Sequence, residues 1–147
     1  MFKKYIVLLL TIIFVQSMLW GDLPTSKEAT LIEAVSSSEV LIEAVGVYNS
    51  NEKSKRKRKK DIKKQGKALA IEDAKKAAVY YLLFNGTDPL LTTPEEIERF
   101  TAIQDQFFNP DTMADLIVYT NPNLNNVISL NKKQGIKVYV EVKVNRS

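Results

Sequence analysis

Between Ile136 and Asn145 the chain alternates strictly between apolar and polar side chains. Because successive side chains of a β-strand point to opposite faces of a sheet, this pattern predicts a strand with one buried face. The buried face would carry Ile136, Val138, Val140, Val142 and Val144. The other face, left for solvent or for a partner, would carry Lys137, Tyr139, Glu141, Lys143 and Asn145. Such a strand requires a sheet and a second layer that covers its apolar face.

Three further segments have strand character. Val127–Leu130 and the turn Asn131–Gly135 precede the alternating strand, and together they predict a hairpin. Glu39–Tyr48 is rich in Val and Ile and contains Gly46, which is typical of a strand buried on much of both faces. Ile117–Tyr119 is long enough for one short strand. These segments supply the neighbours that the alternating strand needs.

A long helix is predicted from Asp61 to Leu83, after a loop at Asn49–Asn51. A stripe of mostly small residues recurs every three or four positions, at Ile71, Ala74, Ala78 and Tyr81. Glu72 and Lys76 have the spacing of an ion pair on the other side. Asn85-Gly86 is a typical helix end. Since Ala lets a helix lie close to a sheet, we expect the stripe to face Val138, Val140 and Val142.

The second helix has the clearest start signal in the chain. Thr93 is the predicted N-cap, Pro94 follows it, and Glu95-Glu96 occupy the first turn. Asn109-Pro110 ends the helix, and Asp111–Leu116 can add a further helical turn. The predicted apolar face consists of Ile97, Phe100, Ile103 and Phe107.

The segment 22–38 is predicted to lead into a single domain at 39–147. Thr25 and Glu28 have capping-box spacing, so Thr25–Val35 is expected to form a short helix. The sequence LIEAV occurs at 31–35 and again at 41–45. We interpret this as a local repetition in which the same five residues take two different structural roles. The predicted fold is α+β, with two helices packed on one face of a small antiparallel or mixed sheet.

Residues 1–21 have the features of a signal peptide in the required order. Lys3 and Lys4 precede an uncharged apolar run at Tyr5–Val15, and the small residues Ser17 and Gly21 follow. The run has 11 residues, which is too few to span a bilayer. We predict cleavage after Gly21, with Ser17 as the second site and an uncleaved anchor as the alternative. The mature protein would then lack a transmembrane helix and reside in the periplasm, at the outer-membrane periphery, or outside the cell.

The chain has neither Cys nor His. Thiol nucleophiles, disulfides, lipid-modified cysteines and the usual neutral-pH general base are therefore excluded from its chemistry. We predict no catalytic residue, no metal site and no cofactor. The alternative is a hydrolase-like enzyme that uses only Asp, Glu, Ser and Lys. Ser50 and Lys53 have the S-x-x-K spacing of some such enzymes, although no companion motif follows.

Ten basic residues fall within the segment 53–67, where only Asp61 opposes them. An exported chain would meet anionic lipids, envelope polysaccharides or acidic protein surfaces rather than nucleic acid, and no aromatic residue is interleaved for base stacking. One interpretation is a solvated linker that frays into the following helix. The other is a polyanion contact made by Lys55, Arg56, Lys57, Arg58, Lys59 and Lys60.

The segment ALAIEDAKKAAVYYLL at 68–83 resembles a helix signature of the flagellar assembly protein T amino-terminal domain and of related small outer-membrane lipoproteins. Ala70, Ile71, Asp73 and Ala74 match its core, after the Gly-containing strand VLIEAVGVY. Gly135–Lys143 match the alternating terminal strand of that family. The resemblance covers about Glu39–Asn145 and rests on short structural motifs, and this chain has no lipobox Cys.

What the resemblance implies is a non-catalytic module that contacts other proteins of the cell envelope or of a flagellar-type assembly. Together with the export signal, it predicts an accessory or binding domain of the envelope. The basic segment 53–67 adds the alternative that the partner is an anionic surface of lipid or polysaccharide. Oligomeric state is not indicated by any motif.

Overall fold

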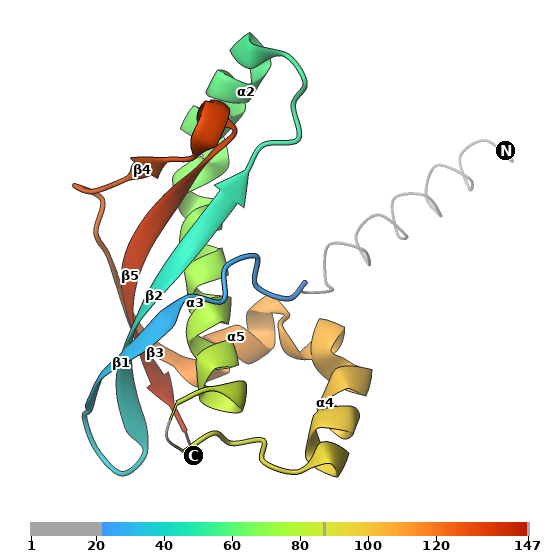
Figure 1. The fold of residues 1–147 in the computed structure, drawn as a ribbon. Helices are drawn as coiled ribbons and strands as arrows, with labels where there is room; N and C mark the ends of the chain where they lie inside the picture. The colour runs from blue at the N-terminus through green and yellow to red at the C-terminus, as the bar shows by residue number, and fades with distance from the viewer. Residues whose placement is uncertain (1–21, 87, 147) are drawn as a thin grey trace, which may run out of the picture.

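The computed structural model describes residues 22–86 and 88–146, so the predicted signal peptide lies outside the described residues. The fold is α+β, with a curled antiparallel sheet of five strands and its helices on one side (Figure 1). The strands are β1 Ala29–Ala34, β2 Glu39–Asn49, β3 Ile117–Pro122, β4 Ile128–Ser129 and β5 Gly135–Asn145. The helical segments are α2 Lys55–Asp61, the π-helix η1 Ile62–Gly66, α3 Lys67–Phe84, α4 Pro94–Phe107, α5 Pro110–Leu116 and the 3-10 turn η2 Asn131–Lys133.

Strands β2 and β5 form the centre of the sheet, in the order β1-β2-β5-β3, with β4 also paired to β5. Ala44 lies opposite Val140, and Ile42 lies opposite Val142, so both strands turn apolar side chains to the same face. The alternation predicted for β5 is confirmed, because every apolar residue from Ile136 to Val144 is buried. The predicted hairpin and the strand at Glu39–Tyr48 are confirmed as well.

Helix α3 covers this apolar face at very short range. A Cβ atom on Gly46 of β2 would lie 1.6 Å from the carbonyl oxygen of Ala70, so only glycine allows the helix backbone to approach so closely. Ala74 and Ala78 are fully buried, as predicted for the stripe that faces the valines of β5. Ile71 and Tyr81 of the predicted stripe are only half-buried. Ala70 and Ala77, which were not in the predicted stripe, are fully buried instead.

The predicted helix at Thr25–Val35 is wrong, because Ala29–Ala34 form the edge strand β1, antiparallel to β2. The backbone amides of Thr25 and Ser26 donate to the Asp73 carboxylate at 2.6 and 3.1 Å, rather than to a helix-capping side chain. A distant acid in α3 thus holds the stretch that leads into β1. The segment 22–38 contributes an edge strand to the domain.

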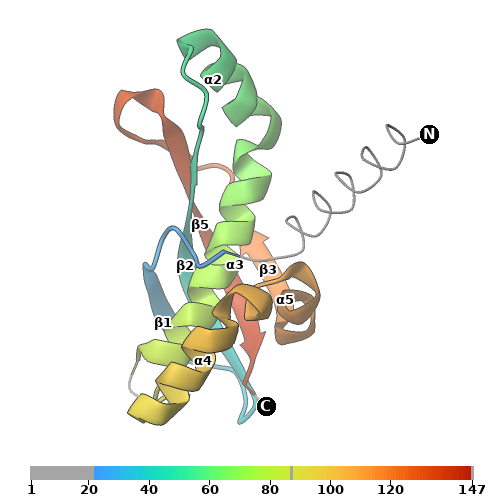
Figure 2. The ribbon, with the colours of Figure 1, turned by 90° about the vertical axis from the view of Figure 1, so that its right-hand side faces the viewer.

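Helix α4 starts as predicted but does not lie on the sheet. Thr93 Oγ1 accepts from the Glu96 amide at 3.2 Å, and the Glu96 carboxylate accepts from the Thr93 amide at 3.1 Å, which completes a capping box. Figures 1 and 2 show α4 beyond α3, on the side away from the strands. The expectation of two helices on the sheet is therefore wrong for α4, and two residues of its predicted apolar face, Ile97 and Ile103, are 39% and 50% exposed.

An aromatic cluster joins α4 to the end of α3. Phe84 of α3 meets Phe100 of α4 with ring centroids 5.5 Å apart, and Phe108 is fully buried beside Phe107. Edge-to-face packing of this kind adds to the free energy of area burial. The two bulky patches at Tyr80–Phe84 and Phe107–Phe108 thus form one core region. This contact explains why α4 is drawn to α3 rather than to the strands.

The helices of the described part of the chain fall short of a membrane span in length or in apolar character. Among them, Lys75 pairs with Glu72 at 2.6 Å, in place of the predicted pair between Glu72 and Lys76.

Candidate functional site

The six predicted cations Lys55, Arg56, Lys57, Arg58, Lys59 and Lys60 occupy helix α2 and are called the basic tip. Residues Asp61 to Lys67 keep helical dihedral angles, so α2, η1 and α3 follow one another without a break. Figure 1 shows α2 at the end of the molecule, past the end of β2. The segment is helical from Lys55 onward, so the helical stretch begins six residues before the predicted start at Asp61.

The basic tip is uncompensated by acid in the part of the chain that the structure describes. Five of its side chains are exposed and Arg58 is half-buried. The ion pairs of residues 22–86 and 88–146 all lie elsewhere, at Lys75–Glu72, Lys137–Glu28 and Arg146–Asp88. Helical geometry therefore concentrates six positive charges on one short segment.

Asp61, the single acid of the basic segment, anchors the tip instead of neutralising it. Its carboxylate accepts hydrogen bonds from Ser50 Oγ at 2.5 Å and from Tyr48 Oη at 2.6 Å, and Gln65 donates a third. These hydrogen bonds hold the pKa of Asp61 below its ordinary value, that of Ser50 first. Burial and the hydrogen bond to Asp61 raise the pKa of Tyr48. The end of β2 is thus fastened to the base of α2.

A hollow of about 430 Å³ separates α2 from the turn at η2, and we call it the tip hollow. The lining residues come from both walls: Lys55, Lys59, Ile62, Ser129 and Lys133. Of the predicted cations, the structure therefore brings only Lys55 and Lys59 to this hollow. Sequence reasoning missed Lys133, because a Lys-Lys pair in a predicted turn does not show which distant segment the turn will meet.

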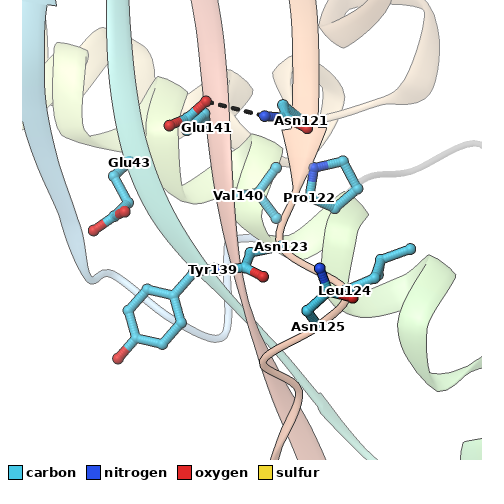
Figure 3. Close-up of a pocket in the computed structure, with 9 residues that line it drawn as sticks. All are labelled: Glu43, Asn121, Pro122, Asn123, Leu124, Asn125, Tyr139, Val140 and Glu141. Atoms are coloured by element: carbon cyan, nitrogen blue, oxygen red, sulfur yellow. Dashed lines mark hydrogen bonds between the residues drawn. The ribbon is translucent and has the colours of Figure 1, made fainter.

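A second hollow, of about 290 Å³, lies on the face of the sheet away from α3 (Figure 3). Glu43 and Glu141 are directly opposite each other on β2 and β5, and Asn121 Nδ2 donates to Glu141 at 3.2 Å. Figure 3 shows the Glu43 carboxylate directed away from Glu141, so the two acids do not converge on one point. The remaining lining residues are Pro122, Asn123, Leu124, Asn125, Tyr139 and Val140.

The two hollows differ in charge, because lysines line the tip hollow and Glu43 and Glu141 line the second. Within the described ranges, no group of three or more Asp or Glu residues is placed to hold a metal ion. The Ser50 hydroxyl donates to Asp61, so its geometry does not follow the S-x-x-K arrangement in which Lys53 would activate it.

No protein-family model matches this chain, and neither a curated protein nor a solved structure shows significant similarity to it. The resemblance to the flagellar assembly protein T amino-terminal domain therefore stays a prediction. The structure does give its signature residues physical roles. Ala70 and Ala74 let the helix touch Gly46, and Asp73 holds the segment that leads into β1.

Proposed function

We propose that this chain is an exported, non-catalytic binding domain of the cell envelope, and that its basic tip binds an anionic surface. The observation that carries the proposal is the basic tip itself, in which a helix that is anchored through Asp61 holds six uncompensated cations at one end of the molecule. The envelope setting rests on the predicted signal peptide at residues 1–21. A role in envelope or flagellar-type assembly rests on the family resemblance alone.

The attraction expected from the tip is mainly coulombic. Each Lys or Arg close to an anionic membrane contributes about 1 kcal/mol, and exposed charges are screened within about 8 Å at physiological ionic strength. Six cations on a short helix are therefore sufficient for an association that weakens steeply with salt. Nucleic acid is a poorer partner for this surface, because no aromatic residue lies on α2 or lines the tip hollow.

The test is co-sedimentation of the mature protein with anionic and neutral vesicles, and with purified envelope polysaccharide, across a salt series. The tip variant carries Arg56, Lys57, Arg58 and Lys60 changed to Gln. A matched control removes four positive charges elsewhere, at Lys27, Lys76, Arg99 and Lys143. We expect the tip variant to lose roughly 3–4 kcal/mol of binding free energy on anionic material, and the control to lose much less. Equal binding by the two variants would refute the proposal.

A further inference from the structure

The tip hollow has two walls, and one residue fastens both of them. Ser50, just after β2, donates its backbone N–H to the carbonyl of Gln134 at 2.9 Å, next to the η2 turn. Its hydroxyl donates to Asp61 at the base of α2. The helix wall and the turn wall are therefore both tied to the end of β2, so the hollow is pre-formed.

The lining of the helix wall follows from helical spacing. Lys55 and Lys59 are four residues apart and Ile62 is three further on, so they share one face, and this face lines the hollow. By the same spacing Lys57 lies on the opposite side of the helix and Lys60 on its flank, and neither lines the hollow. The tip thus has an inner pair of lysines and an outer group of cations.

The turn wall presents a third lysine from a strained backbone. Lys132 and Lys133 have φ angles of 57° and 51°, a left-handed conformation that is uncommon for residues other than glycine. The Lys133 amide donates to Leu130 at 2.9 Å, which closes the turn in this conformation. Lys133 lines the hollow, whereas Lys132 does not.

Three lysines therefore contribute to the lining of one hollow, and no Asp or Glu is among the lining residues. They repel one another unless an anion lies between them, and each offers up to three N–H donors to oxygen acceptors. A phosphomonoester carries about −1.5 to −2 charges at pH 7, and its three terminal oxygens are strong acceptors. A phosphodiester carries a single charge and has two such oxygens, so it matches three lysines less well.

We infer that the tip hollow is a binding site for a phosphomonoester group. The Ser129 hydroxyl offers a further donor, and Ile62 with the lysine stems offers an apolar wall for the carbon skeleton that bears the phosphate. The hollow, at about 430 Å³, leaves room for that skeleton. This inference rests on the proposed function, since it names the chemical group that the basic tip selects on an anionic surface.

The first experiment compares vesicles that contain phosphatidic acid, a phosphomonoester lipid, with vesicles that contain phosphatidylglycerol, a phosphodiester lipid. The two vesicles are matched in surface potential, so that charge alone gives no preference. We expect the mature protein to bind the phosphomonoester vesicles about tenfold more tightly, the ratio that one additional charge-assisted hydrogen bond gives. Equal affinity for both vesicles would overturn the inference and leave the proposed function intact.

Single substitutions then separate the hollow from the rest of the tip. Lys59→Gln and Lys133→Gln should each abolish the tenfold preference, while their controls Lys60→Gln and Lys132→Gln should keep it. Each of the four variants removes one positive charge, either from α2 or from the η2 turn. The nonspecific attraction to an anionic membrane should therefore fall equally in a variant and its control. A preference lost equally in the controls would overturn the assignment.

The last arm uses inorganic phosphate and no membrane. Chemical shifts of the mature protein are followed during titration with phosphate at constant ionic strength, in wild type and in Lys59→Gln. Saturable chemical-shift changes at Lys59, Ser129 and Lys133 that are absent in Lys59→Gln would support the phosphomonoester site. If the same protein does not bind vesicles, only the proposed function is refuted. The absence of saturable shifts, with no preference between vesicles, would overturn the phosphomonoester site.

Discussion

Asp73 illustrates how a single residue determines the path of a distant segment. Asp73 is only 8% exposed, and its carboxylate accepts hydrogen bonds from the backbone amides of Thr25, Ser26 and Val47. Thr25 and Ser26 precede β1, and Val47 belongs to β2. The Asp73 side chain therefore connects α3 to both of these segments. No local pattern around Thr25 indicates this partner.

Asp73→Ala should lower the free energy of unfolding by about 3 kcal/mol, because it leaves these amides without their charged acceptor. Asp73→Asn should have a smaller effect, since its one carbonyl oxygen still accepts. The measurement is urea unfolding, together with hydrogen exchange at Thr25, Ser26 and Val47. The control is Glu72→Ala at the neighbouring exposed position, and an equal loss in both variants would contradict the role assigned to Asp73.

Asp61 makes the anchoring of the tip dependent on pH. Because its pKa is lowered in the folded protein, its contribution to stability is present above the unfolded carboxyl pKa of about 3.9. That contribution is lost as the pH falls through the lower folded value. Stability should therefore drop below about pH 4, and the drop should be smaller in Asp61→Asn.

Tyr48→Phe offers a second check on the same carboxyl group. It removes one of the hydrogen bonds that favour the ionised form, so it should raise the pKa of Asp61 toward the ordinary value. NMR titration of the Asp61 carboxyl carbon measures this shift directly. An unchanged pKa in Tyr48→Phe would show that the hydrogen bond to Tyr48 does not stabilise the carboxylate.

At the scale of elements, the contact between α3 and β2 limits the size of side chains on both sides. Ala74 is fully buried, and its backbone nitrogen would lie 2.8 Å from a Cβ atom at Gly46. Ala74→Trp should therefore lower the free energy of unfolding by about 1–3 kcal/mol through overpacking. Ala68→Trp, at an exposed position of the same helix, is the control. Equal unfolding midpoints for these two variants would show that α3 can move away from the sheet.

At the scale of the whole molecule, the binding surface and the core are separate. None of the residues of α2 is buried, and Ile62 of η1 is the first residue after it that packs against the core cluster. The tip variant with Gln at positions 56, 57, 58 and 60 should thus unfold within about 0.5 kcal/mol of the wild type while its binding is lost. Thermal unfolding monitored by circular dichroism is the measurement. A large loss of stability would mean that the tip supports the fold.

Local sequence determined strand β5 and the start of helix α4, although the capping-box spacing at Thr25 and Glu28 did not lead to a helix. The alternation from Ile136 to Val144 fixed the buried face of β5, and Thr93 with Glu96 fixed the start of α4. The six cations of the tip could also be listed from the sequence. Period-two patterning and capping depend on neighbours along the chain, which is why they can be read without a fold.

Tertiary structure decided which surfaces are covered and which distant groups meet. The two LIEAV copies pair as strands, yet residues 31–35 are exposed, whereas Ile42 and Ala44 are fully buried because α3 covers β2. Ile97 has the spacing of a core residue and remains 39% exposed, since α4 packs beyond α3. Lys133 joins Lys59 only because β2 and β5 carry the turn and the tip to the same end. Each outcome depends on contacts between segments far apart in the chain, which short-range propensities do not encode.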